Sequence, residues 1–149
     1  MPELSAKQAA VKLLTRREHS ASEIRHKLLQ RDFTASEVDD ALAALQRDGW
    51  QSDERYAEAY TRSRRLKGYG PVRIALELKE RGVDEVLAAA CIDAQDAHWL
   101  DTLRTEYRKK YRGKPYSDYA EKAKRMRYLQ YRGFSLDAIH QVVAETWRF

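Results

Sequence analysis

The sequence has few residues that interrupt a helix and almost none that could cross-link the chain. Its 149 residues include three prolines, six glycines and one cysteine. A single cysteine excludes a disulfide framework within the chain and a metal site built from several thiolates. Alanine, leucine, glutamate, lysine and arginine, which favour helices, dominate the composition. The composition therefore predicts an all-α protein.

Long apolar segments are also missing from the sequence. The longest apolar run covers residues 86–92, which is far shorter than the ~20 residues of a membrane-spanning helix. The first residues contain no basic segment followed by an apolar stretch, so they do not resemble a signal peptide. We expect a cytoplasmic protein that does not enter the membrane.

The residue patterns of catalysis and metal binding are not evident either. The four histidines lack metal-ligand spacing with Cys91 or with carboxylates, and we expect them on the surface: His19, His26, His98 and His140. No Ser–His–Asp order, Cys–His pair or carboxylate dyad stands out. We therefore predict a binding protein with no catalytic residue, no metal and no cofactor.

Apolar residues recur with the helical period in nine stretches, which predicts nine helices. Ser20 with Glu23, and Thr34 with Glu37, form capping boxes that open two of them. Pro71 suits the first turn of another, where its missing N–H costs nothing. The predicted inward-facing residues are Ala6, Ala9, Ala10, Leu13, Leu14, Ile24, Leu28, Val38, Ala41, Leu42, Leu45, Tyr56, Ala59, Tyr60, Ser63, Ile74, Leu78, Val86, Leu87, Ala90, Cys91, Leu100, Leu103, Tyr107, Tyr111, Ala123, Met126, Leu129, Ile139, Val142, Val143 and Trp147.

One short sequence motif occurs three times and indicates an internal repeat. A leucine, then an arginine three residues later, then a turn-forming residue and an apolar residue end at positions 33, 83 and 134. The pattern is typical of a helix C-terminus with its hydrophobic contact. Spacings of about 50 residues indicate three copies of one three-helix unit.

The repeats are expected at residues 1–49, 50–95 and 96–149. A unit of this size is marginal alone, so we expect the three to pack in an elongated array that can curve. Trp50, Trp99 and Trp147 are predicted to fill the cores between units. Arg31, Arg81 and Arg132, which mark the repeat, are predicted to favour helix C-termini electrostatically rather than to contact a partner.

Net charge is concentrated in the last third of the chain. Residues 1–50, 51–100 and 101–149 carry net charges of 0, −1 and +6. Residues 104–132 hold eleven basic and three acidic side chains together with six of the nine tyrosines. Cations neutralise phosphates and aromatic rings stack on unpaired bases, which indicates a polyanionic partner. A solvated helical face with tyrosines in the core is the alternative, and for Tyr107 and Tyr111 it is preferred. The candidate contacts here are Arg104, Arg108, Lys109, Lys110, Arg112, Lys122, Lys124, Arg125, Arg127 and Arg132.

A second basic patch surrounds the loop at residues 68–70. It contains no acidic residue between Arg62 and Leu76, and the helix that starts at Pro71 directs its N-terminus, which attracts anions, at the patch. Gly68 as an ordinary helix C-cap amid surface arginines is an equally good physical interpretation. The candidate contacts are Arg62, Arg64, Arg65, Lys67, Tyr69 and Arg73.

Across nearly the whole chain the sequence resembles the bacterial RecX regulators. The resemblance is most specific in the middle repeat, in DGWQSDERYA (residues 48–57), RRLKGYGPVRI (64–74) and ELK (77–79). SASEIR (20–25) and YRGF (131–134) extend it to the other two. Two positions depart from the pattern. Asp32 replaces the glycine of the other copies, without an expected effect on function. Gln51 replaces an apolar residue and is expected to loosen one core contact.

The resemblance implies a modulator of the recombinase RecA that acts in the regulation of DNA repair and the SOS response. Such a protein would lie in the groove of the RecA filament on single-stranded DNA and suppress strand exchange, ATP hydrolysis and co-protease activity. It also favours a binding role for the patch around residues 68–70. We expect a monomer with weak affinity for bare DNA. The alternative is a direct DNA-binding module, because three-helix units recur in helix-turn-helix proteins.

Overall fold

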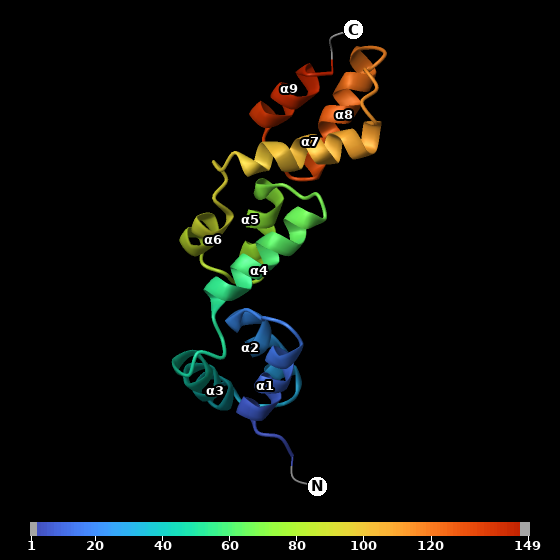
Figure 1. Cartoon of the computed structure of the whole chain (residues 1–149). Coiled ribbons are helices and arrows are strands. Elements are labelled where there is room, and N and C mark those ends of the chain that lie inside the picture. Colours follow the sequence, from blue (N-terminus) through green and yellow to red (C-terminus); the bar gives the residue numbers. More distant parts are fainter. Residues whose placement is uncertain (1–2, 147–149) are drawn as a thin grey trace. The chain divides into compact units, whose positions relative to one another are not determined.

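The computed structural model describes residues 3–146 and consists of helices joined by short turns (Figure 1). Within that range it contains nine helices and no strand, as the periodicity predicts. The helices are α1 Ala6–Arg16, α2 Ala21–Gln30, α3 Ala35–Arg47, α4 Asp53–Leu66, α5 Pro71–Glu80, α6 Glu85–Ile92, α7 His98–Tyr111, α8 Tyr119–Tyr131 and α9 Leu136–Ala144. None of these helices is both long and apolar enough to cross a membrane.

The first and third repeats are three-helix bundles with the predicted apolar stripes inside. In the first repeat α1, α2 and α3 all pack against one another, and in the third α9 packs on both α7 and α8. The core of the first repeat consists of Ala6, Ala9, Ala10, Ile24, Leu28, Val38, Ala41, Leu42 and Leu45. The buried apolar residues of the third include Leu103, Tyr107, Leu129, Ile139, Val142 and Val143.

The middle repeat is shared between two compact units. The first unit combines the chain up to Tyr60 with Leu78–Cys91, and the second combines Thr61–Glu77 with the chain from Ile92 onward. The last three residues of α5 and almost all of α6 therefore belong with the first repeat, while most of α5 belongs with the third. Each outer repeat thus acquires its packing partner from the middle of the chain.

Polar caps open the helices at the predicted positions. The boxes at Ser20 and Thr34 are both complete, and Ser5 with Gln8 forms a third that the sequence analysis did not identify. The eighth helix begins at Tyr119, because Asp118 is its N-cap and accepts the N–H of Glu121.

The repeated motif forms the same turn in all three copies. We call it the acceptor turn (residues 31–33, 81–83 and 132–134). Each turn has two hydrogen bonds to the end of its own helix. The N–H of the apolar residue donates to the leucine carbonyl, at 3.3, 3.0 and 3.3 Å. The N–H of the residue before it donates to the carbonyl of the residue after that leucine. The middle residue of each is left-handed, with φ of 66° at Asp32, 78° at Gly82 and 103° at Gly133. This is the Schellman geometry, and it confirms the predicted helix C-termini.

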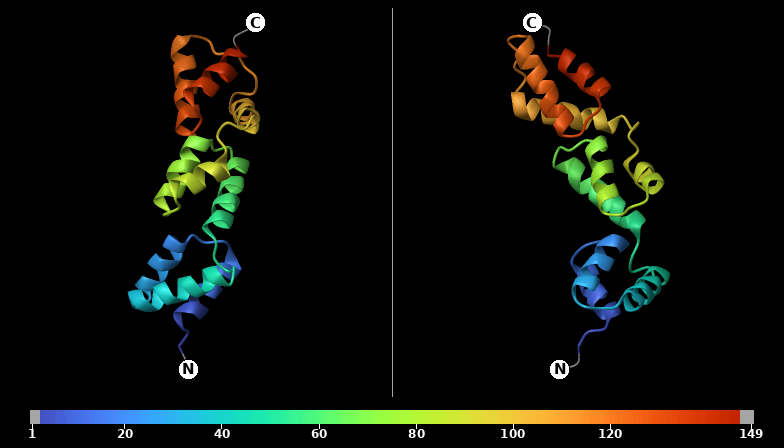
Figure 2. Two further views of the ribbon diagram at one scale, coloured as in Figure 1. Left: turned by 90° about the vertical axis from the view of Figure 1, so that its left-hand side faces the viewer. Right: turned by 180° about the vertical axis from the view of Figure 1, so that it is seen from behind.

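In each unit the start of one repeat's second helix packs on the acceptor turn of the following repeat. In the first unit the hydroxyl of Ser20 donates to the carbonyl of Arg81 at 2.8 Å. In the second unit, the N–H groups of Gly70 and Val72 donate to the carbonyls of Arg132 and Gly133, each at 2.9 Å. Figure 2 shows this second contact as the end of α8 beside the start of α5. A donor at a helix start, a cap hydroxyl in the first unit and free N–H groups in the second, thus meets carbonyls at the end of another helix.

Several predicted core positions are wrong. Val86 is 77% exposed and Trp50 49% exposed, because Ala88 and Ile92 form the buried face of α6 and the chain turns outward at Trp50. Ser63 is exposed, and Thr61 is buried in its place. The other two tryptophans differ from Trp50. Trp99 is buried and its indole N–H donates to the carbonyl of Ile92 at 3.1 Å. Trp147 lies outside the described residues.

Gln51, which was expected to loosen a core contact, is buried, and each polar atom of its amide is hydrogen-bonded. It donates to the carbonyl of His19 at 3.2 Å and to the carboxylate of Asp53 at 2.9 Å, and its oxygen accepts from Gln46 at 3.0 Å. The carboxylate of Asp53 in turn accepts the N–H of Ala21 at 2.9 Å. This polar chain connects the linker before α4 to the start of α2.

His19 was predicted to lie on the surface, and this prediction is wrong. The residue is buried, with only 2% of it exposed. Its Nε2 lies 3.1 Å from the ammonium of Lys27, which can only donate, so its Nδ1 carries the proton and donates to the carbonyl of Arg17 at 3.0 Å. The ring is therefore neutral. Burial lowers the pKa of His19, and the nearby charges of Arg17 and Lys27 lower it further.

Adding a methyl group to an acceptor turn should destabilise the protein. Gly82 and Gly49 have φ of 78° and 80°, but a Cβ on Gly82 would lie 2.4 Å from the Cβ of Ser22, whereas nothing lies within 4 Å at Gly49. Gly82→Ala should lower the free energy of unfolding by about 1 to 3 kcal/mol more than Gly49→Ala, in which only the backbone cost remains. Urea unfolding of the two variants measures the difference. Equal losses would show that the turn is not tightly packed.

The neutral His19 predicts a loss of stability in mild acid. Because its pKa is lower in the folded state than in the unfolded chain, unfolding takes up a proton, and stability falls as the pH drops below about 6.5. The loss ends once the pH is below the folded pKa. His19→Asn should flatten the dependence of the unfolding free energy on pH between about 7 and 5. His26→Asn, at an exposed histidine, should leave it unchanged, and an unchanged slope in His19→Asn would contradict this interpretation.

Candidate polyanion interface

Three of the predicted contact arginines are used inside the second unit. The guanidinium groups of Arg64, Arg132 and Arg73 lie over the ring of Tyr69, at 3.8, 3.9 and 4.7 Å from its centre. The Arg132 side chain also donates to the carbonyl of Gly68 at 3.3 Å and to that of Lys67. These carbonyls belong to the end of α4, so Arg132 caps a helix, which agrees with the structural role predicted for the repeat arginines.

Two half-buried carboxylates neutralise much of this arginine cluster. Glu77 accepts two hydrogen bonds from Arg64, at 3.0 and 2.9 Å, and one from Arg73 at 3.4 Å. Glu106 pairs with Arg132 at 3.4 Å and accepts the hydroxyl of Tyr128 at 3.0 Å. These arginines stabilise the acceptor turn and the loop that packs on it. These pairs give the three half-buried arginines a structural role, and their contact with a partner stays a prediction.

Arg125 is buried, so its predicted contact with a partner is not supported. Only 3% of its side chain is exposed. It donates to the hydroxyl of Tyr107 at 2.8 Å, to the carbonyl of Lys114 at 2.7 Å and to the carboxylate of Glu121 at 2.9 Å. Its guanidinium also lies 4.4 Å from the centre of the Tyr111 ring. The side chain thus ties the loop between α7 and α8 to both helices.

Glu121 stays ionised well into acid because several donors converge on it. The hydroxyl of Ser117 donates to its carboxylate at 2.6 Å, the N–H of Ser117 at 2.9 Å, and Arg125 adds a third bond. In that order these bonds lower the pKa of Glu121 to about 2. Arg104 is also occupied, because it pairs with Glu145 at 2.9 Å and with Asp101 at 3.5 Å.

The other predicted cations remain available at the surface. Within residues 3–146 they form no ion pair, although Lys110, Lys122 and Arg65 each lie over an aromatic ring. Arg65 and Lys122 are half-buried, and the rest are exposed. This set consists of Arg62, Arg65, Lys67, Arg108, Lys109, Lys110, Arg112, Lys122, Lys124 and Arg127.

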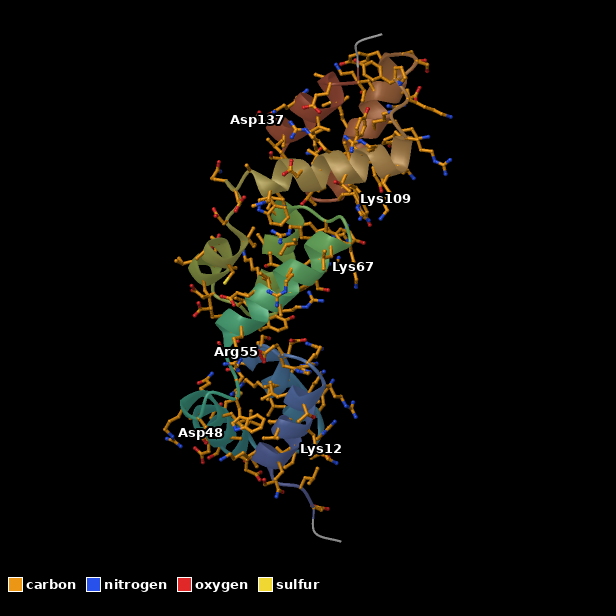
Figure 3. All side chains as sticks on the ribbon, viewed as in Figure 1. Lys12, Asp48, Arg55, Lys67, Lys109 and Asp137 are labelled. Carbon is orange, nitrogen blue, oxygen red and sulfur yellow. The ribbon has the colours of Figure 1, made fainter. Side chains whose placement is uncertain are left out.

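A cleft of about 330 Å³ gathers some of these cations between the end of α4 and one face of α7. Arg65 and Lys109 line it, and Lys67 precedes Gly68 in its wall. Figure 3 shows Lys109 on α7 and Lys67 just after the end of α4. The other lining residues are Leu66, Gly68, His98, Asp101, Thr102, Thr105 and Glu106.

The charge of the cleft is positive because its carboxylates are occupied. Asp101 pairs with Arg104 and Glu106 with Arg132. Arg65, Lys67 and Lys109 have no such partner among the described residues. An anionic group at this site would therefore meet two or three unneutralised cations. Sequence pattern alone indicates these three residues, but it does not distinguish them from the neighbouring arginines that form ion pairs.

Substituting the buried Arg125 and its exposed neighbour Lys124, one at a time, should separate a structural role from a binding role. Arg125→Met leaves the hydroxyl of Tyr107 and the carbonyl of Lys114 without their donor, and should lower the free energy of unfolding by about 1 to 3 kcal/mol. Lys124→Met, at the exposed neighbour, should change stability by less than about 0.5 kcal/mol. Thermal and urea unfolding test this. Equal stability of the two variants would contradict the buried placement of Arg125.

Comparisons with known proteins agree with the three-repeat structure. Models of the first, second and third three-helix domains of RecX match residues 6–45, 52–92 and 96–143. The regulatory protein RecX of Legionella pneumophila (strain Corby) is 40% identical over 137 residues, which cover 92% of this chain and 91% of that protein. RecX of Ectopseudomonas mendocina (strain ymp) is 38% identical over 145 residues, or 94% and 93% of the two chains.

A solved structure shows the same fold. The crystal structure of RecX from Lactobacillus salivarius superposes with a TM-score of 0.80 at 23% identity, over 95% of this chain and 94% of that one.

Proposed function

The chain belongs to the RecX family of regulatory proteins, and we propose that it binds the filament of the recombinase RecA on single-stranded DNA. Binding would inhibit strand exchange, ATP hydrolysis and co-protease activity, without catalysis by this chain. The observation that carries the proposal is the cleft at which Arg65, Lys67 and Lys109 remain unneutralised. A nucleoprotein filament is densely anionic, and such a cluster is attracted to it.

The chemistry of the cleft favours backbone contact over base reading. Its cations are two flexible lysines and one arginine that is partly covered by Trp99, with its guanidinium 5.7 Å from the ring centre. Phosphate contacts of this kind are independent of sequence and weaken as salt displaces the protein from the polyanion. The same cleft would give a modest affinity for bare DNA, which would help the protein reach its filament.

Direct reading of duplex DNA is the second candidate, and the third helices of the repeats argue against it. A tandem helix-turn-helix reader places a basic helix in the groove in each unit. Here α6 and α9 contain no lysine or arginine, and α3 carries Glu37, Asp39 and Asp40. Tight, sequence-dependent binding to bare duplex at physiological salt would favour this second candidate.

Removing the lysines of the cleft should weaken inhibition of RecA. The natural chain should slow DNA-dependent ATP hydrolysis by RecA, and Lys67→Ala with Lys109→Ala should raise the concentration for half-inhibition by roughly tenfold, the equivalent of about 1.4 kcal/mol. The salt dependence of binding should also become shallower, because about two cation contacts are lost. Titration of each protein into the ATPase assay at several salt concentrations measures both effects.

The matched control removes two exposed lysine and arginine charges from the first repeat. Lys12 and Arg47 are exposed and form no ion pair among the described residues, so Lys12→Ala with Arg47→Ala changes the net charge by the same amount. This control should inhibit almost as well as the natural chain. Equal losses in the two double variants would show that overall charge, not the cleft, determines binding. If the natural chain did not slow ATP hydrolysis at any ratio, the proposed function would be wrong.

A further inference from the structure

Two of the three acceptor turns are covered, and the first repeat's turn is not. Residues 81–83 receive the start of α2, and residues 132–134 receive the start of α5. No repeat precedes the first one within the described residues, so nothing corresponding packs on residues 31–33. Arg31 and Asp32 are exposed there.

The covered turns have no room for a side chain at their middle residue. A Cβ on Gly82 would lie 2.4 Å from the Cβ of Ser22. A Cβ on Gly133 would lie 2.3 Å from the Cβ of Arg73 and 2.8 Å from its backbone nitrogen. Such distances are impossible without displacing the helix start. A glycine is therefore a condition for docking, apart from its ease at positive φ.

The uncovered turn has aspartate at this position. Asp32 has the same left-handed backbone, with φ of 66°, so the turn is fully formed and differs only in its side chain. Its surroundings include a hollow of about 580 Å³, lined in part by Glu3, Phe33 and Glu37. An incoming helix start would meet the Cβ of Asp32 where Gly82 and Gly133 offer none. It would also meet the Arg31 cation among the carboxylates of this hollow.

The third repeat has the opposite free surface, the start of α8. Its position corresponds to the starts of α2 and α5, and no repeat follows to receive it among the described residues. Tyr119 is 81% exposed, and Asp118 and Ala120 are exposed as well. This helix start also carries carboxylates, at Asp118 and Glu121. A second copy of the chain could therefore bring its own α8 start to an open acceptor turn.

We propose that Asp32 closes the first acceptor turn against the α8 start of a second copy and so ends the repeat array. A contact between the free turn of one molecule and the free helix start of the next is heterologous, and it would extend into open chains rather than close. The Cβ of Asp32 blocks that contact sterically. This inference concerns contacts between copies and is independent of the proposed action on RecA.

Asp32→Gly should open the turn and allow head-to-tail association. Glycine suits the left-handed turn, so the variant should fold. Because the docked surface is small, association will be weak. Titration of the ¹⁵N-labelled variant with unlabelled protein should give a dissociation constant about tenfold or more below that of the natural chain. Chemical-shift changes should be confined to residues 31–37 and 117–121, and sedimentation velocity should show the larger species.

Two further variants make the test specific. Asp32→Asn removes the charge but keeps the Cβ, and should remain as monomeric as the natural chain. Ala120→Arg in the Asp32→Gly background places a long side chain on the helix start and should abolish the association. The proposal is overturned if Asp32→Gly associates no more strongly than the natural chain, if Asp32→Asn associates equally well, or if Ala120→Arg has no effect.

Discussion

The docking of a helix start on the acceptor turn of the following repeat is the contact on which each unit depends. Each repeat has helices of only 8 to 14 residues, too short to be stable alone in water. Docking pairs the donors of a helix start with the carbonyls of a helix end, and the glycine of the turn allows the backbones to approach. The outer repeats therefore gain buried contacts from the middle repeat without a large shared apolar core.

The same contact explains why the charges of the chain divide into two groups. Arg64, Arg73 and Arg132 surround Tyr69 beside the acceptor turn, where Glu77 and Glu106 balance them. Paired there, they are half-buried and their charges are balanced within the unit. The cations left over, including Lys67 and Lys109, lie at the cleft next to this cluster. Structure and candidate binding surface are thus adjacent, and they compete for the same residue types.

Periodicity and capping rules were sufficient for the helices, because both depend on residues close in sequence. The stripes at Ile24 and Leu28, and the boxes at Ser20 and Thr34, follow from local spacing alone. Burial of Arg125 and His19 depends on partners that the fold supplies: the carbonyl of Lys114 for one, and the ammonium of Lys27 for the other. The short, mostly apolar α6 has no clear periodicity, so its exposed face at Val86 could not be identified. The sequence also showed Asp32 as a departure from the repeat, but its significance required the contacts at Gly82 and Gly133.

Hydrogen exchange at two backbone amides tests the docking contact most directly. Val72 and Ala120 are each the second residue of a helix, with exposed side chains, and both amides precede the internal hydrogen bonds of their helix. The amide of Val72 donates to the carbonyl of Gly133 at 2.9 Å, whereas no repeat that could receive the start of α8 follows within residues 3–146. We predict that Val72 exchanges far more slowly than Ala120 under native conditions. Equally fast exchange at the two positions would contradict the account.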